Sequence, residues 1–154
     1  MKKKEFYFWR RFFAFLIDVI IISLLTSPLQ KVIEKKVQLP ANFSDFILFI
    51  MNPHALDNVK SFLFIMSLLI AFIALAYWTI LEFTLKQSIG KMVFHLKVES
   101  KRVSQCIVRN LSKAMVFTNP FFFVFIMDIL YSFFTKDHLR LFEKWSKTQV
   151  VKKE

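Results

Sequence analysis

Residues 9–25 read WRRFFAFLIDVIIISLL, an apolar run that opens with an arginine pair and contains one carboxylate, Asp18. An apolar segment of this length is typical of a membrane helix. An ionisable group near the bilayer centre costs several kcal/mol, so it usually faces other helices or a water-filled cavity and has a partner. The sequence therefore predicts a polar contact for Asp18 inside the membrane.

Arg11 lies on the same face of this predicted helix as Asp18. The two residues are seven positions apart, which is close to two helical turns and an axial rise of about 10 Å. We expect Arg11 to lie at the headgroups and Asp18 deeper in the hydrocarbon. Two roles are open for Arg11 and for Arg109: contact with lipid headgroups, or neutralisation of an intramembrane acid.

Composition places the whole chain in the membrane class. Its 154 residues are 56% hydrophobic and include 21 phenylalanines, which is far too apolar for a soluble domain. We expect one domain, residues 1–154, folded as an all-α membrane protein: a small polytopic helical bundle with a short cytoplasmic β element. The net charge of +11 comes from basic blocks beside apolar runs, which indicates membrane lipids as partners and no nucleic acid.

Metal sites and catalysis have little support in the sequence. The chain has one cysteine, Cys106, and three scattered histidines without zinc-type spacing. Residues 88–91 lack the second glycine and the trailing hydroxyl residue of a phosphate-binding loop. We expect no metal, no cofactor and no enzymatic activity.

The charge pattern predicts the topology. Basic residues before position 12 place the N-terminus in the cytoplasm, and no small-residue cleavage site follows the first apolar run. Spans are predicted at about 12–27, continuing towards Lys36, and at 61–82. Between them lies an outer loop, 28–60, whose short apolar segment 46–51 is expected at the surface or against the helix ends.

The second half of the chain is predicted to return to the cytoplasm. Residues 93–99 alternate as in a short strand. Residues 104–135 are predicted to form a helical hairpin or re-entrant pair bending at Asn119-Pro120, so three or four membrane segments are open. The basic tail, 136–154, then lies in the cytoplasm. There 148–151 is expected to pair with the strand near 96–98.

Four patches of the chain resemble the RDD family of small prokaryotic membrane proteins. Arg11 followed by Asp18 is similar to the opening of the family. Glu82 with Ser88, Gly90 and Lys91 resembles the segment after its second helix. Arg109-Asn110-Leu111 and the closing run 140–151, which contains Glu143 and Thr148, resemble its last two motifs.

The chain departs from the family pattern at several places. Glu143 stands where aspartate is common, and His95 and Phe142 stand where glycine is frequent. Both Asp128 and Glu143 compete for the role of the second aspartate of the family. The resemblance implies a transport role in the cell membrane without naming a substrate.

Asp18, Asp128 and Glu82 are the candidate ion or proton sites. Carboxylates withdrawn from water bind protons more readily, and two at one depth can hold a small cation. One hypothesis is transport of a monovalent cation or proton, with Arg11 and Arg109 setting the charge. The other is a non-transporting membrane adaptor or scaffold, whose buried charges only lock the bundle.

Two further expectations concern packing. Gly90 is the only glycine of the chain, and we expect it to occupy a turn conformation that other residues resist. A chain of this size is too small to enclose a complete pathway alone, which favours a homo-oligomer.

Overall fold

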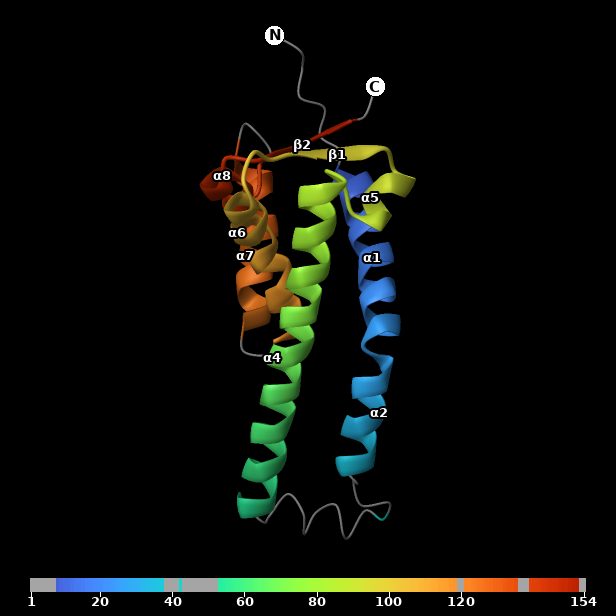
Figure 1. Ribbon diagram of the computed structural model, residues 1–154. Helices are drawn as coiled ribbons and strands as arrows, with labels where there is room; N and C mark the ends of the chain where they lie inside the picture. Colours follow the sequence, from blue (N-terminus) through green and yellow to red (C-terminus); the bar gives the residue numbers. More distant parts are fainter. Residues whose placement is uncertain (1–7, 38–41, 43–52, 119–120, 136–138, 153–154) are drawn as a thin grey trace.

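The computed structural model describes residues 8–37, 42, 53–118, 121–135 and 139–152. Within these ranges the chain is mostly helical and has one two-stranded sheet (Figure 1). The helical class and the short β element predicted from the sequence are thereby confirmed. The predicted segment 46–51 lies outside the described residues.

Two long helical columns run the length of the molecule (Figure 1). One consists of α1, Phe8–Leu25, and α2, Ser27–Lys36, which are bent by 60° at Thr26. The other is α4, Pro53–Thr84, whose 32 residues extend about 48 Å. Asp57–Thr84 is long and apolar enough to cross a bilayer, and Phe8–Leu25 with Ser27–Ile33 passes the same test as a bent pair.

Both ends of the predicted outer loop are helical, and at the first end this agrees with the expected continuation of the first span towards Lys36. Residues 28–36 belong to α2, and 53–60 belong to α4. Both helices have a proline in their first turn, Pro28 and Pro53. Proline is tolerated there because the N–H group it lacks has no partner within the helix.

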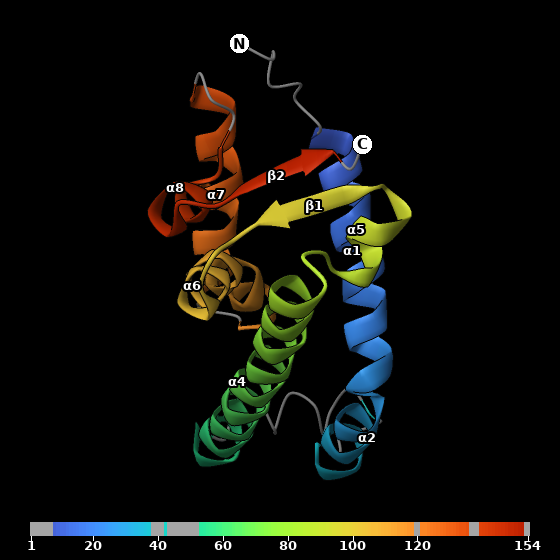
Figure 2. The same cartoon turned by 45° about the horizontal axis from the view of Figure 1, so that its top comes forward.

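Four short elements close one end of the columns, and we call them the cap: α5, Ile89–Val93; β1, Leu96–Glu99; α8, Leu141–Ser146; and β2, Gln149–Lys152. The antiparallel strands cross over this end, as Figure 2 shows. Val98 lies opposite Val150, and both side chains are buried. The predicted strand pairing is confirmed, but β1 starts later than expected because α5 extends to Val93.

The region 103–134 contains two helices joined through a short 3-10 turn. These are α6, Val103–Ala114; η1, Met115–Phe117; and α7, Phe122–Phe134. The predicted bend at 119–120 lies outside the described residues. The 13 residues of α7 extend about 20 Å, which is less than the roughly 30 Å of a bilayer core.

Helix α6 buries its polar face and exposes its apolar face. Arg109, Asn110 and Lys113 are buried, whereas Ile107 and Leu111 are exposed. A soluble helix normally shows the opposite arrangement. The reversed pattern fits a helix whose outer side faces lipid and whose inner side carries the polar contacts of the protein.

Candidate functional site

Asp18 connects α1 to the start of α5. Its Oδ1 accepts hydrogen bonds from the Gly90 N–H at 2.8 Å and the Tyr77 hydroxyl at 3.2 Å. Its Oδ2 accepts one from the Ser88 hydroxyl at 2.5 Å. Asp18 therefore satisfies a free backbone N–H in the first turn of α5, although it comes from another helix.

Asp128 repeats this arrangement at α8. Its Oδ1 accepts a hydrogen bond from the Phe142 N–H at 3.0 Å, and its Oδ2 accepts one from the Ser112 hydroxyl at 2.8 Å. Each aspartate thus pairs with one serine and one N–H in the first turn of a short cap helix. In the described part of the chain, these two aspartates have no hydrogen-bond partner in common.

Glu82, near the end of α4, is fully buried among cations. Its Oε1 accepts hydrogen bonds from the Nζ atoms of Lys91 and, at 2.9 Å, Lys113. Its Oε2 accepts one from Asn110 at 3.0 Å and lies 3.5 Å from Arg109 Nε. One carboxylate therefore holds three cationic side chains that come from α5 and α6.

Glu143, in α8, accepts hydrogen bonds from two arginines. Arg109 Nη2 donates to its Oε1 at 2.9 Å, and Arg11 Nη1 donates to its Oε2 at 3.2 Å. The backbone N–H of Arg140 also donates to Oε2 at 3.3 Å. Arg109 therefore lies between the two buried glutamates. We call the connected set the ionic cluster: Arg11, Glu82, Lys91, Arg109, Lys113 and Glu143.

Burial and neighbouring charges shift the proton affinities in the cap. Burial disfavours the ionised form of Glu143, but the guanidinium groups of Arg109 and Arg11 outweigh it and lower the pKa of this carboxyl to about 2. Burial also lowers the pKa of Lys91 well below its ordinary value, although Glu82 opposes the shift. The ammonium form of Lys91 is therefore less favoured here than it is in water.

Gly90 brings α5 against the backbone of α1. A Cβ atom at this position would lie 2.0 Å from the carbonyl oxygen of Ala14. The expected turn conformation is wrong, because Gly90 does not have a positive φ angle. Close approach of two backbones, rather than a left-handed conformation, excludes a side chain here. Two residues near Gly90 do have left-handed backbones, Lys86 with φ of 57° and His95 with φ of 53°.

The predicted site residues divide into those in the ionic cluster and those that support it. The first group consists of Arg11, Glu82, Lys91, Arg109 and Glu143. Both arginines of this group contact Glu143 instead of either aspartate. The remaining family-motif residues support this arrangement. Ser88 and Gly90 bind Asp18, while the Thr148 N–H donates to the carbonyl oxygen of Glu143 at 3.0 Å.

Several residues of the site were not identified from the sequence. They are Tyr77, Ser112 and Lys113, whereas Asn110 and Arg140 were named only as parts of the family motifs. A signal for part of this set was present: Cys106, Arg109, Asn110 and Lys113 follow the i, i+3, i+4, i+7 spacing of one helix face. A polar stripe of this kind on a helix whose opposite face is apolar is expected to contact other parts of the protein.

The comparisons with known proteins identify a family. The model of the RDD family matches residues 7–147. No curated protein and no solved structure matches the chain. The matched range contains the ionic cluster and both aspartate contacts, and it ends before β2.

Proposed function

Because the chain belongs to the RDD family, whose members are usually membrane-associated, we propose that it is a multi-pass transport protein moving a small cation or a proton across the cell membrane. The observation that carries this proposal is the contact between Glu82 and Lys91. A buried carboxylate and a buried ammonium group form a pair whose charge changes when one proton leaves.

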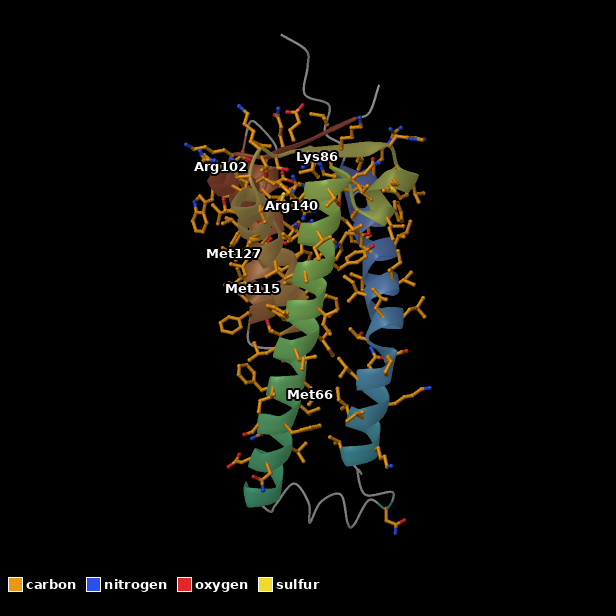
Figure 3. The ribbon with its side chains drawn as sticks, in the orientation of Figure 1. Met66, Lys86, Arg102, Met115, Met127 and Arg140 are labelled. Carbon is orange, nitrogen blue, oxygen red and sulfur yellow. The ribbon has the colours of Figure 1, made fainter. Side chains whose placement is uncertain are left out.

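The proposed orientation places the cap in the cytoplasm. The first residues of α1 and the strand β2 lie at the same end of the molecule (Figure 1). Lys86, Arg102 and Arg140 are at this end too, whereas Met66 lies far along α4 (Figure 3). The positive-inside bias supports a cytoplasmic cap with both termini on that side, and α6 with α7 as a re-entrant pair.

The proposed mechanism exchanges a proton on Lys91 for a cation on Glu82. While Lys91 is protonated, its ammonium group occupies the Glu82 carboxylate. Loss of that proton removes one positive charge and leaves a carboxylate lone pair for a monovalent cation. Burial lowers the pKa of Lys91, which favours this release. Cation binding is therefore expected to strengthen as pH rises.

Flux measurements in proteoliposomes test the proposal. Sodium or potassium uptake driven by a pH gradient is expected for the parent protein. Glu82→Gln is expected to abolish it, and Lys91→Gln is expected to remove its dependence on pH. Glu99→Gln is the matched control, because Glu99 is an exposed carboxylate on β1.

Folding of each variant is checked by gel filtration in detergent before reconstitution. Failure of Glu82→Gln to fold would leave Lys91→Gln to decide. Absence of flux in the parent protein with either ion and either gradient direction would refute transport.

A second candidate function, a non-transporting membrane adaptor, is favoured by a basic groove in the cap. The groove has a volume of about 790 Å³ and is lined partly by five lysines. These are Lys86, Lys97, Lys101, Lys144 and Lys147. Such a surface suits anionic lipid headgroups. In this alternative Asp18 and Asp128 serve only to hold α5 and α8 on the bundle.

In the adaptor hypothesis Asp18 and Asp128 are structural, so Asp18→Asn and Asp128→Asn are expected to change the stability of the protein. Both variants are expected to lose stability, since each amide replaces a charged acceptor of backbone and serine hydrogen bonds. Binding to vesicles with and without anionic lipid measures the affinity of the groove for anionic headgroups. Stronger binding to anionic vesicles together with zero flux supports the adaptor, and preserved flux refutes it.

Exposed apolar side chains on the long columns are proposed to contact lipid or a second copy of the chain. Leu24 and Phe72 are 70% and 71% exposed. Light scattering of the detergent-solubilised protein measures the number of copies. A mass above that of one chain after subtraction of detergent would support the proposed homo-oligomer.

A further inference from the structure

A small cavity lies beside the ionic cluster. Its volume is about 20 Å³, enough for one water-sized particle. Cationic side chains dominate its lining: Arg11, Lys91, Arg109, Lys113 and Arg140, with Asp18, Glu143, Phe15 and Val150 completing it. The cavity therefore lies where α1, the cap and α6 meet.

Buried donors at this cavity have no hydrogen-bond acceptor among the described residues. They are Nη1 and Nε of Arg109 and Nε of Arg11. Arg109 is only 3% exposed, and its Nε is 3.5 Å from Glu82 without a hydrogen bond. A buried charged donor without an acceptor is costly. These guanidinium groups therefore have capacity for an additional acceptor at the cavity.

The balance of charge specifies an anionic acceptor. Five cationic side chains line the cavity, against the acids Asp18 and Glu143 in the lining and Glu82 behind it, an excess of two positive charges. With Lys91 neutral, one positive charge still remains in excess. Uncompensated charge of this kind is unfavourable in a buried site.

The acids of the lining are already committed to other donors. Both oxygens of Asp18 accept hydrogen bonds from Tyr77, Gly90 and Ser88. Both oxygens of Glu143 accept them from arginines. At Asp18 and Glu143 a bound cation would find few free lone pairs, unlike at Glu82 after Lys91 has lost its proton, whereas an anion in the cavity would find free N–H groups.

We infer that this cavity binds a monatomic anion, and chloride is the simplest candidate. The guanidinium groups of Arg11, Arg109 and Arg140 hold the anion. The volume suits one such ion and excludes phosphate or sulfate unless the walls move. The ion offsets the positive excess and links α1 and α6 to the cap. This inference goes beyond the proposed transport function and does not depend on it.

Thermal unfolding of the full chain in detergent tests the site. Sodium chloride and sodium bromide are compared with sodium gluconate and sodium phosphate at equal ionic strength. Chloride and bromide are expected to raise the Tm in a saturable way, and gluconate and phosphate are not. Equal Tm values in all four salts, or saturable stabilisation by phosphate alone, would overturn the inference.

Arg140→Gln and Lys31→Gln form the matched pair of variants. Arg140 lines the cavity, and Lys31 is an exposed lysine on α2 that lines neither the cavity nor the basic groove. Arg140→Gln is expected to raise the half-saturating chloride concentration roughly tenfold, since one charged hydrogen bond is lost. Lys31→Gln is expected to leave it unchanged. Equal shifts in both variants would show a general charge effect and overturn the site.

Anomalous scattering from bromide-soaked crystals of the parent protein gives a readout that needs no variant. A bromide peak within contact distance of Arg109 Nη1 is expected. A peak of water density there, without anomalous signal, would overturn the inference. This measurement stays decisive if Arg140→Gln fails to fold, and it is equally decisive if the parent protein transports nothing.

Discussion

The two ends of the molecule differ in how much of their side-chain surface they bury. At the cap end, Glu82, Arg109 and Glu143 are buried while apolar residues of α6 face outward. In the far half, which we define as α2 with residues 57–73 of α4, Phe72 and Ile65 are mostly exposed. Only 6% of an apolar 18-residue stretch of α4 is buried inside the chain. In Figure 3 the labelled charged residues Lys86, Arg102 and Arg140 lie at the cap end, and Met66 lies in the far half.

This contrast indicates which interactions stabilise each end. The cap end is held by specific hydrogen bonds and ion pairs in a site withdrawn from water, where each is worth more than at a surface. The far half has few buried side chains among the described residues. Substitutions are therefore expected to act strongly at the cap end and weakly in the far half.

The largest expected effect is that of Gly90→Ala. The added methyl group would lie 2.0 Å from the Ala14 carbonyl oxygen, so α5 must move away from α1 and Asp18 loses its backbone donor. We expect a loss above about 4 kcal/mol, enough to prevent stable folding. Yield and gel-filtration profile in detergent measure it. Ile89→Ala, at an exposed neighbour, is the control, and equal behaviour of the two variants would contradict the close approach.

The next effect is acid sensitivity through Glu143. Its pKa is lowered from 4.5 to about 2 in the folded protein, so its stabilisation is complete above pH about 4.5 and is lost as pH falls towards 2. The loss is roughly 3 kcal/mol. Denaturant unfolding across this pH range measures it.

Glu143→Gln is expected to be less stable at neutral pH and to lose this part of the acid dependence, because Arg11 and Arg109 then lack their carboxylate. Glu99→Gln serves as the exposed control. An unchanged slope between pH 4.5 and 2 in Glu143→Gln would show that other groups cause the acid sensitivity.

Trp78→Ala and Phe72→Ala compare the two ends on a single helix. Trp78 is fully buried against Ile22 and Ala74, whereas Phe72 is 71% exposed. Trp78→Ala is expected to cost about 3–5 kcal/mol, and Phe72→Ala less than about 0.5 kcal/mol. Unfolding in the same detergent measures both. A cost at Phe72 close to that at Trp78 would show that the far half is packed against a second copy.

The smallest expected effect is a gain from His95→Gly. His95 has φ of 53°, a conformation that costs a residue with a side chain energy and glycine almost nothing. Part of this gain is offset by the greater freedom of glycine in the unfolded chain. We expect about 0.5–1 kcal/mol of added stability. Lys97→Gly, at a β1 position, should destabilise instead, and a loss at both positions would refute the explanation.

Local sequence patterns were sufficient for the long elements and for the family. The apolar runs at 9–25 and 61–82 predicted the two columns, and the alternation before Glu99 predicted β1. The helix that begins at Pro53 was predicted to start only at residue 61, because a proline marks a loop and the first turn of a helix equally well.

The candidate site was predicted only as separate residues. Arg11 and Asp18 share a helix face, so the sequence favoured a direct relation between them, yet Arg11 contacts Glu143, which is 132 positions away. Asp18 instead binds the start of α5. The partner of a long cationic side chain such as that of Arg11 depends on which elements fold against its helix, and no local sequence pattern contains that information.

The sequence by itself determined that the chain has apolar helices, a basic end and buried acids, because hydropathy and charge act over a few neighbouring residues. Only the tertiary structure decided that Glu82 holds two lysines and an arginine, that Gly90 serves backbone contact, and that an excess of positive charge surrounds a small cavity. These features arise where α1, α4, α6 and the cap meet. Charged side chains are buried there, and a buried charge is costly unless an opposite charge pairs with it.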